Sequence, residues 1–148
     1  MNFQDFTATF TVDQRPEAVF AAINDVRGWW SGDIEGRTNT VGDVWTYRYM
    51  DIHCSKQRIT ELVPGERVAW HVLDGHLDFT EDKKEWTGTD IAFDITEKDG
   101  KTEVRFTHVG LTPEFECFDN CSNAWGFYIK ESLRELITSG QGQPNATE

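Results

Sequence analysis

The side chains able to do chemistry in this sequence begin with His108, in the segment VRFTHV. His108 follows Val104 and Phe106 at strand spacing, which predicts that its ring points into the interior. An imidazole there is able to orient a ligand hydroxyl or carboxylate, or to act as an acid or base. The alternative, which we favour, is a buried neutral histidine bonded to a backbone carbonyl. No nucleophile or paired carboxylate accompanies it at a recognised spacing, so we predict no catalytic residue and lean against an enzyme.

Aromatic side chains on the last long helical pattern form a second group of candidates. Trp125 and Tyr128 are three residues apart on that pattern. Together they suit a cavity lined by rings and a few polar groups, although Trp125 alone is more typical of helix packing on a sheet. Tyr128 is the better ligand candidate, because a buried tyrosine hydroxyl needs a partner. Regular strands would bring Tyr47, Tyr49 and Trp70 to face it, whereas a β-bulge would reverse them.

Two adjacent tryptophans, Trp29 and Trp30, stand between Gly28 and Gly32. Burying one tryptophan removes about 150–250 Å² from water, so both indoles are strongly drawn inward. Successive residues point in different directions, which predicts that one indole enters the core while its neighbour covers the mouth of a cavity. The alternative is that both simply fill one end of the sheet.

The cysteines and histidines do not predict a metal site. Cys54, Cys117 and Cys121 include no CxxC pair, there is no HExxH motif, and the spacing of His71 and His76 matches no usual ligand set. We therefore predict neither a metal nor a cofactor. An odd number of cysteines in a chain of this size indicates reduced thiols and a cytoplasmic location.

Composition excludes several classes of partner. The 148 residues include 14 lysines and arginines against 26 aspartates and glutamates, for a net charge of −12 and a pI near 4.7. Such a field repels phosphate backbones and anionic lipids, so neither nucleic acid nor a membrane is an expected partner. The sequence has no apolar run long enough to span a membrane and no signal-peptide pattern at its start. Aromatic residues make up 13% of the chain, which indicates either a thick core or a lined cavity.

Hydrophobic periodicity predicts strands through the first half of the chain, interrupted by one short helix. Phe3–Val12 alternates as a strand, and Asp13 is a candidate cap for a helix that begins near Pro16 and runs to about Asn24. After a loop, further strands are predicted over Val44–His53, Lys56–Val63 and Arg67–Val72, and Pro64-Gly65 joins the last two as a hairpin. Residues 73–88 are polar and acidic and are predicted to form a long loop or an edge hairpin.

The second half contains a clear hairpin and then one long amphipathic helix. The segment DIAFDITEKDGKTEVRFTHVG places Ile91, Phe93 and Ile95 opposite the inward side of its second strand, across a KDGK turn. A helix is predicted from Thr112 to Gly140. We expect one domain over residues 1–140 with a disordered tail at 141–148, and an α+β fold in which the helix crosses one antiparallel sheet.

Five segments in this order resemble the SRPBCC (START-like, helix-grip) superfamily: PEAVFAAINDVRGWW, ITELVPGERVAW, EWTGTDIAF, KTEVRFTHVGL and CSNAWGFYIKESLRELI. Within it, the chain is similar to the branch named for the C-terminal domain of the activator of the ninety-kilodalton heat-shock chaperone's ATPase. The resemblance extends from Phe3 to Pro144. One departure is Ala124, where many members have a glycine before the helix tryptophan at a close contact.

The resemblance implies a curved antiparallel sheet wrapped around the C-terminal helix, with a cavity between them that often holds an apolar or amphipathic molecule. It also makes the Trp29–Trp30 turn a plausible edge of that cavity. We therefore expect a small-molecule binding protein for an apolar or aromatic ligand, either a monomer or a homodimer. An interaction module for a chaperone is the alternative, and a cyclase, aromatase or hydrolase ranks below it. The expected ligand-binding residues are Trp29, Trp30, Tyr47, Tyr49, Trp70, Phe93, Phe106, His108, Trp125 and Tyr128.

Overall fold

The structure, a computed structural model, describes residues 6–30, 33–38, 40–49, 53–77, 86–111 and 118–142. The elements in chain order are β1 (Phe6–Val12), α1 (Pro16–Asn24), η1 (Val26–Gly28), β2 (Asp33–Gly36), β3 (Val44–Tyr49), β4 (His53–Val63), β5 (Arg67–Leu77), β6 (Asp90–Lys98), β7 (Lys101–Val109), α2 (Phe118–Phe127), η2 (Tyr128–Leu133) and α3 (Arg134–Ser139). The predicted helix start at Thr112 and the predicted tail from residue 143 onward lie outside the described residues.

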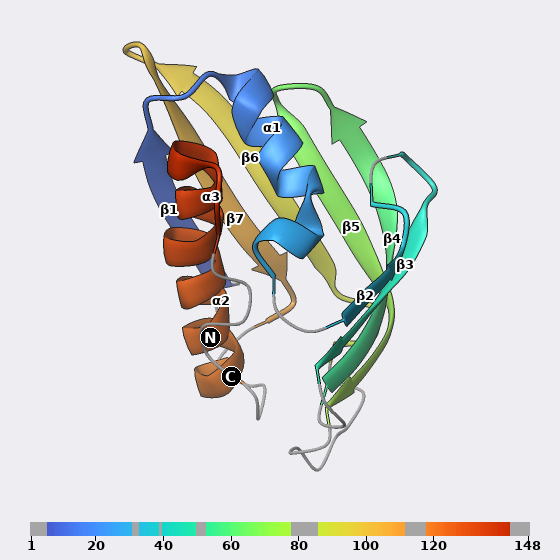
Figure 1. Ribbon diagram of the computed structural model, residues 1–148. Helices are drawn as coiled ribbons and strands as arrows, with labels where there is room; N and C mark the ends of the chain where they lie inside the picture. The colour runs from blue at the N-terminus through green and yellow to red at the C-terminus, as the bar shows by residue number, and fades with distance from the viewer. Residues whose placement is uncertain are drawn as a thin grey trace.

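The strands form one curved antiparallel sheet in the order β1-β7-β6-β5-β4-β3-β2 (Figure 1). Neighbours in the sheet are also neighbours in the chain, except that β1 pairs with β7. Consecutive antiparallel strands need only short turns, and the turn residues of KDGK and Pro64-Gly65 lie at two of them. The sheet therefore follows from the hairpin signals in the sequence plus one long-range pairing.

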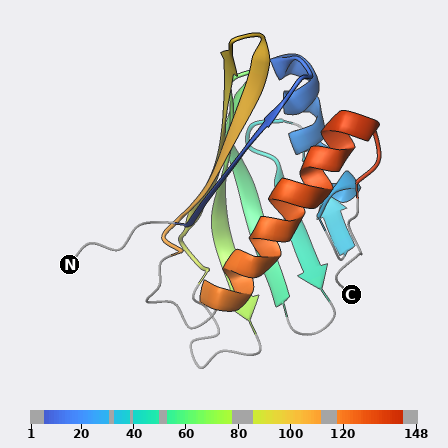
Figure 2. The ribbon, with the colours of Figure 1, turned by 90° about the vertical axis from the view of Figure 1, so that its left-hand side faces the viewer.

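One face of the sheet carries all the helices that the structure describes. The helices α2, η2 and α3 continue one another as a single coil that crosses the sheet obliquely, and α1 lies beside it on the same face (Figures 1 and 2). The middle segment, η2, has the wider turns of a π-helix. The predicted α+β helix-grip architecture is confirmed: a curved antiparallel sheet holds a long C-terminal helix.

Alternation along the strands selects the side chains of the inner face. Buried and exposed residues alternate through β1 and through β7, as period-two sequences require. The predicted orientation of Val104, Phe106 and His108 is observed, and all three are fully buried. The inner face also carries Ala8, Phe10, Val12, Trp45, Tyr47, Ser55, Gln57, Ile59, Val68, Trp70, Val72, Ile91, Phe93, Ile95 and Thr102.

Two predictions about strands were wrong. Val44–His53 is not one strand, because β3 ends at Tyr49 and β4 begins at His53, which pairs with Tyr49. Residues 73–88 were expected to form a long loop or an edge hairpin, and residues 73–77 are the end of β5, which continues to Leu77 against β4. The strand β2 was expected to be loop. In each case pairing with a neighbouring strand decides where the strand begins and ends. The local hydrophobic pattern of a segment carries no information about that neighbouring strand.

Helix ends were predicted more accurately than strand ends. Pro16 opens α1 as expected, but Asp13 does not cap it: Arg15 occupies the cap position, and the carboxylate of Asp13 lies 3.2 Å from Nζ of Lys101. Gly140 ends the long helix with a φ of 85°, a left-handed conformation that suits glycine. Ala124 is exposed, so the departure from the family pattern does not fall at a close contact.

Candidate functional site

The inner face near the middle of the molecule is a continuous surface of aromatic rings, the aromatic wall. Trp30 lies at its centre and stacks on Tyr47, with ring centroids 4.1 Å apart and planes 10° apart. Trp30 also contacts Trp125 on the helix, at 4.9 Å between centroids. The rings of the wall belong to Trp29, Trp30, Trp45, Tyr47, Trp70, Phe93, Phe106 and Trp125. The structure thus brings together seven of the ten residues predicted for the ligand site.

Both indoles of the tryptophan pair are buried, at 0% and 4% exposure for Trp29 and Trp30. Their rings are stacked 6.1 Å apart, so the expectation that one indole would cover a mouth while the other entered the core does not describe this geometry. The backbone of Trp29 (φ −134°, ψ −24°) is not extended, because the pair follows the short helical turn η1. Successive side chains of a helical turn differ by about 100° rather than 180°, which lets both point toward the sheet.

Trp29 is held in place by hydrogen bonds at both its indole and its backbone. Its Nε1 donates to the carbonyl of Ile23 at 3.1 Å, and its own carbonyl accepts from Oγ of Ser132 at 2.8 Å. Ser132 lies in η2, so the tryptophan turn is tied directly to the long helix. Both hydrogen bonds are buried, and Trp29 is therefore a structural residue that positions Trp30.

A buried chain of hydrogen bonds, the His108 cluster, joins Thr89, His108 and Trp125. The indole Nε1 of Trp125 donates to His108 Nδ1 at 3.1 Å, and His108 Nε2 lies 2.9 Å from Oγ1 of Thr89. Thr89 Oγ1 in turn donates to the carbonyl of Trp86 at 2.6 Å. Because an indole only donates, Nδ1 carries no proton and the ring is neutral with its proton on Nε2. Both ring nitrogens are used, and the partners are side chains rather than the expected backbone carbonyl.

Trp86 closes the interior beside this cluster and was not among the predicted site residues. Its ring lies 4.7 Å from that of His108, edge to face, and is stacked 5.8 Å from Trp125. A Cβ at position 75 would come within 2.5 Å of the Trp86 Cβ, so the glycine there permits the close approach. The acidic residues around Trp86 led us to expect a long loop or an edge hairpin, and no periodicity signalled that its indole would be buried.

A second buried polar group, the Gln57 cluster, comprises Trp45, Ser55, Gln57 and Trp70. Gln57 is 0% exposed, and its Nε2 donates to Oγ of Ser55 at 2.7 Å. Within the part of the chain that the structure describes, its Oε1 has no hydrogen-bond partner, nor do the Nε1 atoms of Trp45 and Trp70. Each buried polar atom left without a partner typically costs about 1–3 kcal/mol. This cluster was missed in the sequence, although Ser55 and Gln57 share the strand parity of the buried Ile59.

The remaining predicted residues lie near the wall or beyond the described side chains. Tyr128 is buried at the start of η2, with its ring 5.3 Å from that of Phe127. Tyr49 ends β3, but its side chain lies outside the described residues, as do those of Cys117 and Cys121. Among the described residues, no three histidine, cysteine, aspartate or glutamate side chains are placed to hold a metal ion.

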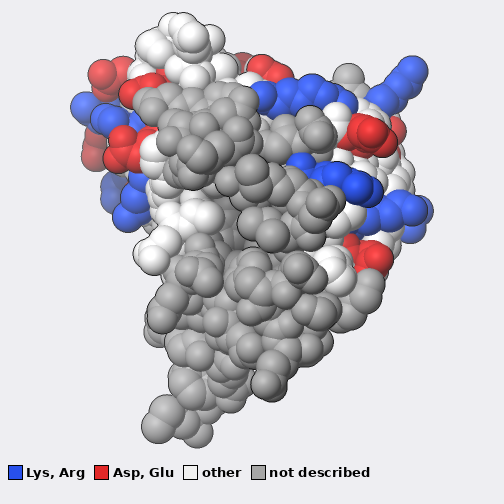
Figure 3. All heavy atoms as spheres, turned by 60° about the horizontal axis from the view of Figure 1, so that its bottom comes forward, with Lys and Arg blue, Asp and Glu red and all other residues white. Residues whose placement is uncertain are grey.

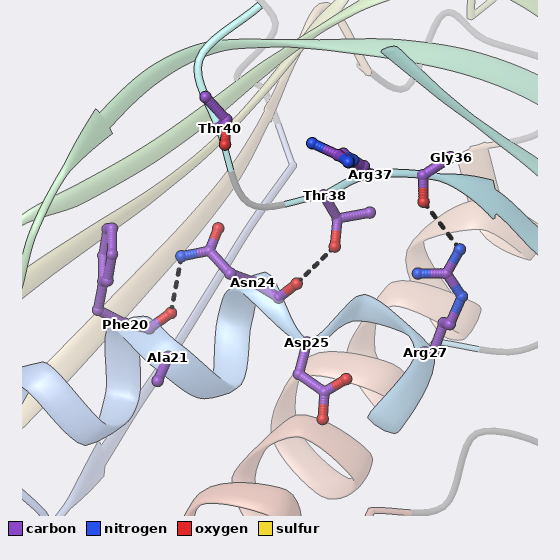
Figure 4. Close-up of a pocket in the computed structure, with 9 residues that line it drawn as sticks. All are labelled: Phe20, Ala21, Asn24, Asp25, Arg27, Gly36, Arg37, Thr38 and Thr40. Carbon is purple, nitrogen blue, oxygen red and sulfur yellow. Dashed lines mark hydrogen bonds between the residues drawn. The ribbon is translucent and has the colours of Figure 1, made fainter. Parts of the chain in front are cut away.

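A groove of about 660 Å³ lies away from the aromatic wall, between α1, η1 and the segment after β2 (Figure 4). Arg27 closes one side by donating to the carbonyls of Ile34 and Gly36, at 2.9 Å each. Thr38 closes another by donating to the carbonyl of Asn24 at 2.7 Å. The polar groups of the groove thus serve largely to hold the walls of the groove together. The groove does not lie between the sheet and the C-terminal helix, where a cavity was expected.

The surface around the end of the molecule seen in Figure 3 has no uniform charge over its described part, where basic and acidic side chains are interspersed. No helix in the described part of the chain is both long and apolar enough to cross a membrane.

The fold and the aromatic interior define a helix-grip α+β protein whose sheet and long helix enclose a ring-lined core. Residues 13–138 match the family model described as Activator of Hsp90 ATPase homolog 1-like protein, and the chain belongs to this family. The resemblance seen in the sequence is thereby confirmed. A comparison with curated proteins found no match.

Solved structures share the fold at low sequence identity. The Aha1 dimer from Colwellia psychrerythraea, determined in solution, is similar with a TM-score of 0.75 and 23% identity, over 94% of this chain and 99% of that one. SSP2350 from Staphylococcus saprophyticus gives a TM-score of 0.68 and 19% identity, over 97% and 98% of the two chains. DynU16, from the dynemicin biosynthetic locus, gives 0.64 and 14%, over 92% of this chain and 48% of that one. At these identities the likeness establishes the fold alone.

Proposed function

We propose that this protein binds a small apolar or aromatic molecule against the aromatic wall, between the sheet and the C-terminal helix. The observation that carries the proposal is the wall itself: eight rings from the sheet, the tryptophan turn and the helix meet on one face. Such a surface offers a guest both apolar burial and ring stacking, which are the main sources of affinity in small-molecule sites. A helix-grip fold suits either a ligand-binding or an interaction module.

The test is a direct search for a guest. Native mass spectrometry of protein purified without denaturation should reveal a bound small mass, or naphthalene should shift the indole N–H signal of Trp30 in NMR until it saturates. Tyr47→Leu removes a ring stacked on Trp30 and should weaken naphthalene binding by about 2–12-fold, the value of one aromatic pair. Phe20→Leu is the matched control, because Phe20 lines the separate groove, and its Kd should stay within about 2-fold of wild type.

The proposal is wrong if no mass co-purifies and naphthalene does not shift the indole signals. It is also wrong if Phe20→Leu weakens naphthalene binding as much as Tyr47→Leu does, since the guest would then lie elsewhere.

A second candidate function is an interaction with a chaperone or with another copy of this chain. Two observations favour it: the family is described by activation of the Hsp90 ATPase, and the Colwellia relative is a dimer. Titration against Hsp90 at physiological salt, read by binding and by ATPase rate, tests the chaperone partner, and light scattering of the purified chain tests self-association. An unchanged ATPase rate without binding removes the first, and a monomer at all concentrations removes the second.

The hypothesis that the protein is an enzyme gains no support from the His108 cluster. A general acid or base must reach the reacting proton, whereas both nitrogens of His108 are already engaged by Trp125 and Thr89. A cytoplasmic location remains our proposal from the three cysteines, and cell fractionation tests it.

A further inference from the structure

The Gln57 cluster contains polar atoms that the aromatic wall does not satisfy. Trp45 and Trp70 each bury an indole N–H without an acceptor, and Gln57 buries an amide oxygen without a donor. Exchanging the oxygen and nitrogen of the amide would not remove the deficit: one of the two atoms would still contact Ser55, and the other would still lack a partner. The deficit therefore belongs to the cluster and not to one orientation of one side chain.

Strand register places the residues that carry these atoms close together on the inner face of the sheet. Trp45 pairs with Gln57 between β3 and β4, and Ile59 pairs with Trp70 between β4 and β5. The Trp45 and Trp70 rings meet edge to face, with centroids 5.0 Å apart. Trp30 contacts both of these indoles from the helical side. A guest on this part of the wall would lie against the side chains that carry the unsatisfied atoms.

The surroundings of the Gln57 cluster favour a ligand group that is polar but uncharged. The basic residues on the same strand, Lys56 and Arg58, have the opposite parity and are exposed, so they do not face the cluster. An unpaired carboxylate would lose its hydration without gaining a counter-ion, which strongly disfavours it. A hydroxyl donates one hydrogen bond and accepts two, so it is able to serve the amide and the indole N–H groups in either amide orientation.

We propose that the Gln57 cluster binds the neutral hydroxyl of a guest whose aromatic or apolar body lies on the wall. This inference rests on the proposed function and adds the polar group that the ligand must carry. Gln57 is then the specificity-determining residue, Trp45 and Trp70 supply the donors, and Ser55 holds the amide in place. An ordered water at the same atoms is the competing occupant, and it would confer no preference for a hydroxyl.

The experiment compares two guests that differ only in the hydroxyl, 2-naphthol and naphthalene, at pH 7, where a phenolic hydroxyl is neutral. Wild-type protein should bind 2-naphthol at least about 10-fold more tightly, because naphthalene leaves the buried polar atoms unpaired. The double variant Ser55→Ala/Gln57→Leu should reduce that ratio to about 2 or less while still binding naphthalene. Thr89→Val removes a buried hydroxyl outside the cluster and should preserve the ratio.

The outcomes separate this inference from the function on which it rests. Equal affinity of wild type for both guests, or a preference that survives in the double variant, overturns the hydroxyl site but leaves binding at the wall intact. Failure of both guests to bind removes the proposed function and the inference together. Circular dichroism of each variant before titration establishes that the comparison is made on folded protein.

Discussion

The His108 cluster and the Gln57 cluster lie on the same face of one sheet and are equally buried, yet their hydrogen bonding is opposite. In the first, Trp125, His108 and Thr89 pass hydrogen bonds in one direction until the chain ends on a backbone carbonyl. In the second, three polar atoms of Trp45, Gln57 and Trp70 have no partner. A completed network stabilises a fold, whereas an incomplete one lowers stability unless something else occupies it. The comparison favours a structural role for the His108 cluster, and it underlies our proposal of a binding role for the Gln57 cluster.

The largest expected effect is the loss of the completed network. His108→Ala should destabilise the protein by about 3–5 kcal/mol, because it leaves a cavity and deprives both Trp125 and Thr89 of their partner. Urea unfolding followed by circular dichroism measures the change, with Val109→Ala at the exposed neighbouring position as the control. A loss below about 1 kcal/mol would contradict the structural role given to His108.

A smaller loss of stability is expected when the hydrogen-bond chain of the His108 cluster is shortened without a change in side-chain shape. Thr89→Val keeps the side-chain volume but leaves His108 Nε2 without its acceptor, so stability should fall by about 1–3 kcal/mol. Nitrogen NMR of the imidazole checks the same point, since the wild-type ring should be neutral with its proton on Nε2. Finding the proton on Nδ1 instead would contradict the direction in which Trp125, His108 and Thr89 pass their hydrogen bonds.

At the Gln57 cluster the expected change in stability has the opposite sign. The double variant Ser55→Ala/Gln57→Leu replaces both members of a buried polar pair by apolar groups, and it should range from neutral to about 2 kcal/mol more stable than wild type. Thermal and urea unfolding without ligand measure it. The comparison between the two clusters breaks down if this variant is destabilised as much as Thr89→Val.

The smallest effect is expected for polar groups on the opposite face of the sheet. Arg67 pairs with Glu61 and Asp94, and the hydrogen bond that its guanidinium donates to Glu61, then that to Asp94, raises the pKa of the guanidinium. A raised pKa on a cation contributes stability below that pKa, and arginine stays charged well above neutrality, so the contribution should be constant from about pH 6 to 9. Arg67→Gln should cost less than about 1 kcal/mol, and high salt should reduce the difference.

Measuring the Arg67→Gln effect at both ends of this pH range and at two salt concentrations completes the series. Lys101→Gln, whose pairing with Asp13 is more exposed, gives the matched surface value. If Arg67→Gln lost as much stability as Thr89→Val, burial would not determine how much these polar groups contribute to stability.

Much of the sheet and part of the site were predictable because strand alternation is a local property. A spacing of two placed Tyr47, Trp70, Phe93 and Phe106 correctly on the inner face, despite register shifts between β4 and β5. The same rule applied to Ile59 would have placed Gln57 inward, but a glutamine between basic residues is ordinarily interpreted as exposed. Strand ends were predicted less well, since β5 extends to Leu77 through pairing and not through any hydrophobic pattern of its own.

The sequence by itself determined the order of the described elements apart from β2, the inward parity of the ring-bearing strands and the helix that ends at Gly140, because each depends on residues within a few positions of one another. Only the tertiary structure decided which buried polar atoms obtain partners. His108 receives its hydrogen bond from an indole 17 residues away and lies against a hydroxyl 19 residues away. Trp45 lies beside Gln57 on the neighbouring strand and against the ring of Trp70, yet within the described part of the chain a polar atom of each has no hydrogen-bond partner. Such pairing depends on distances between side chains of different strands and helices, which only the folded chain establishes.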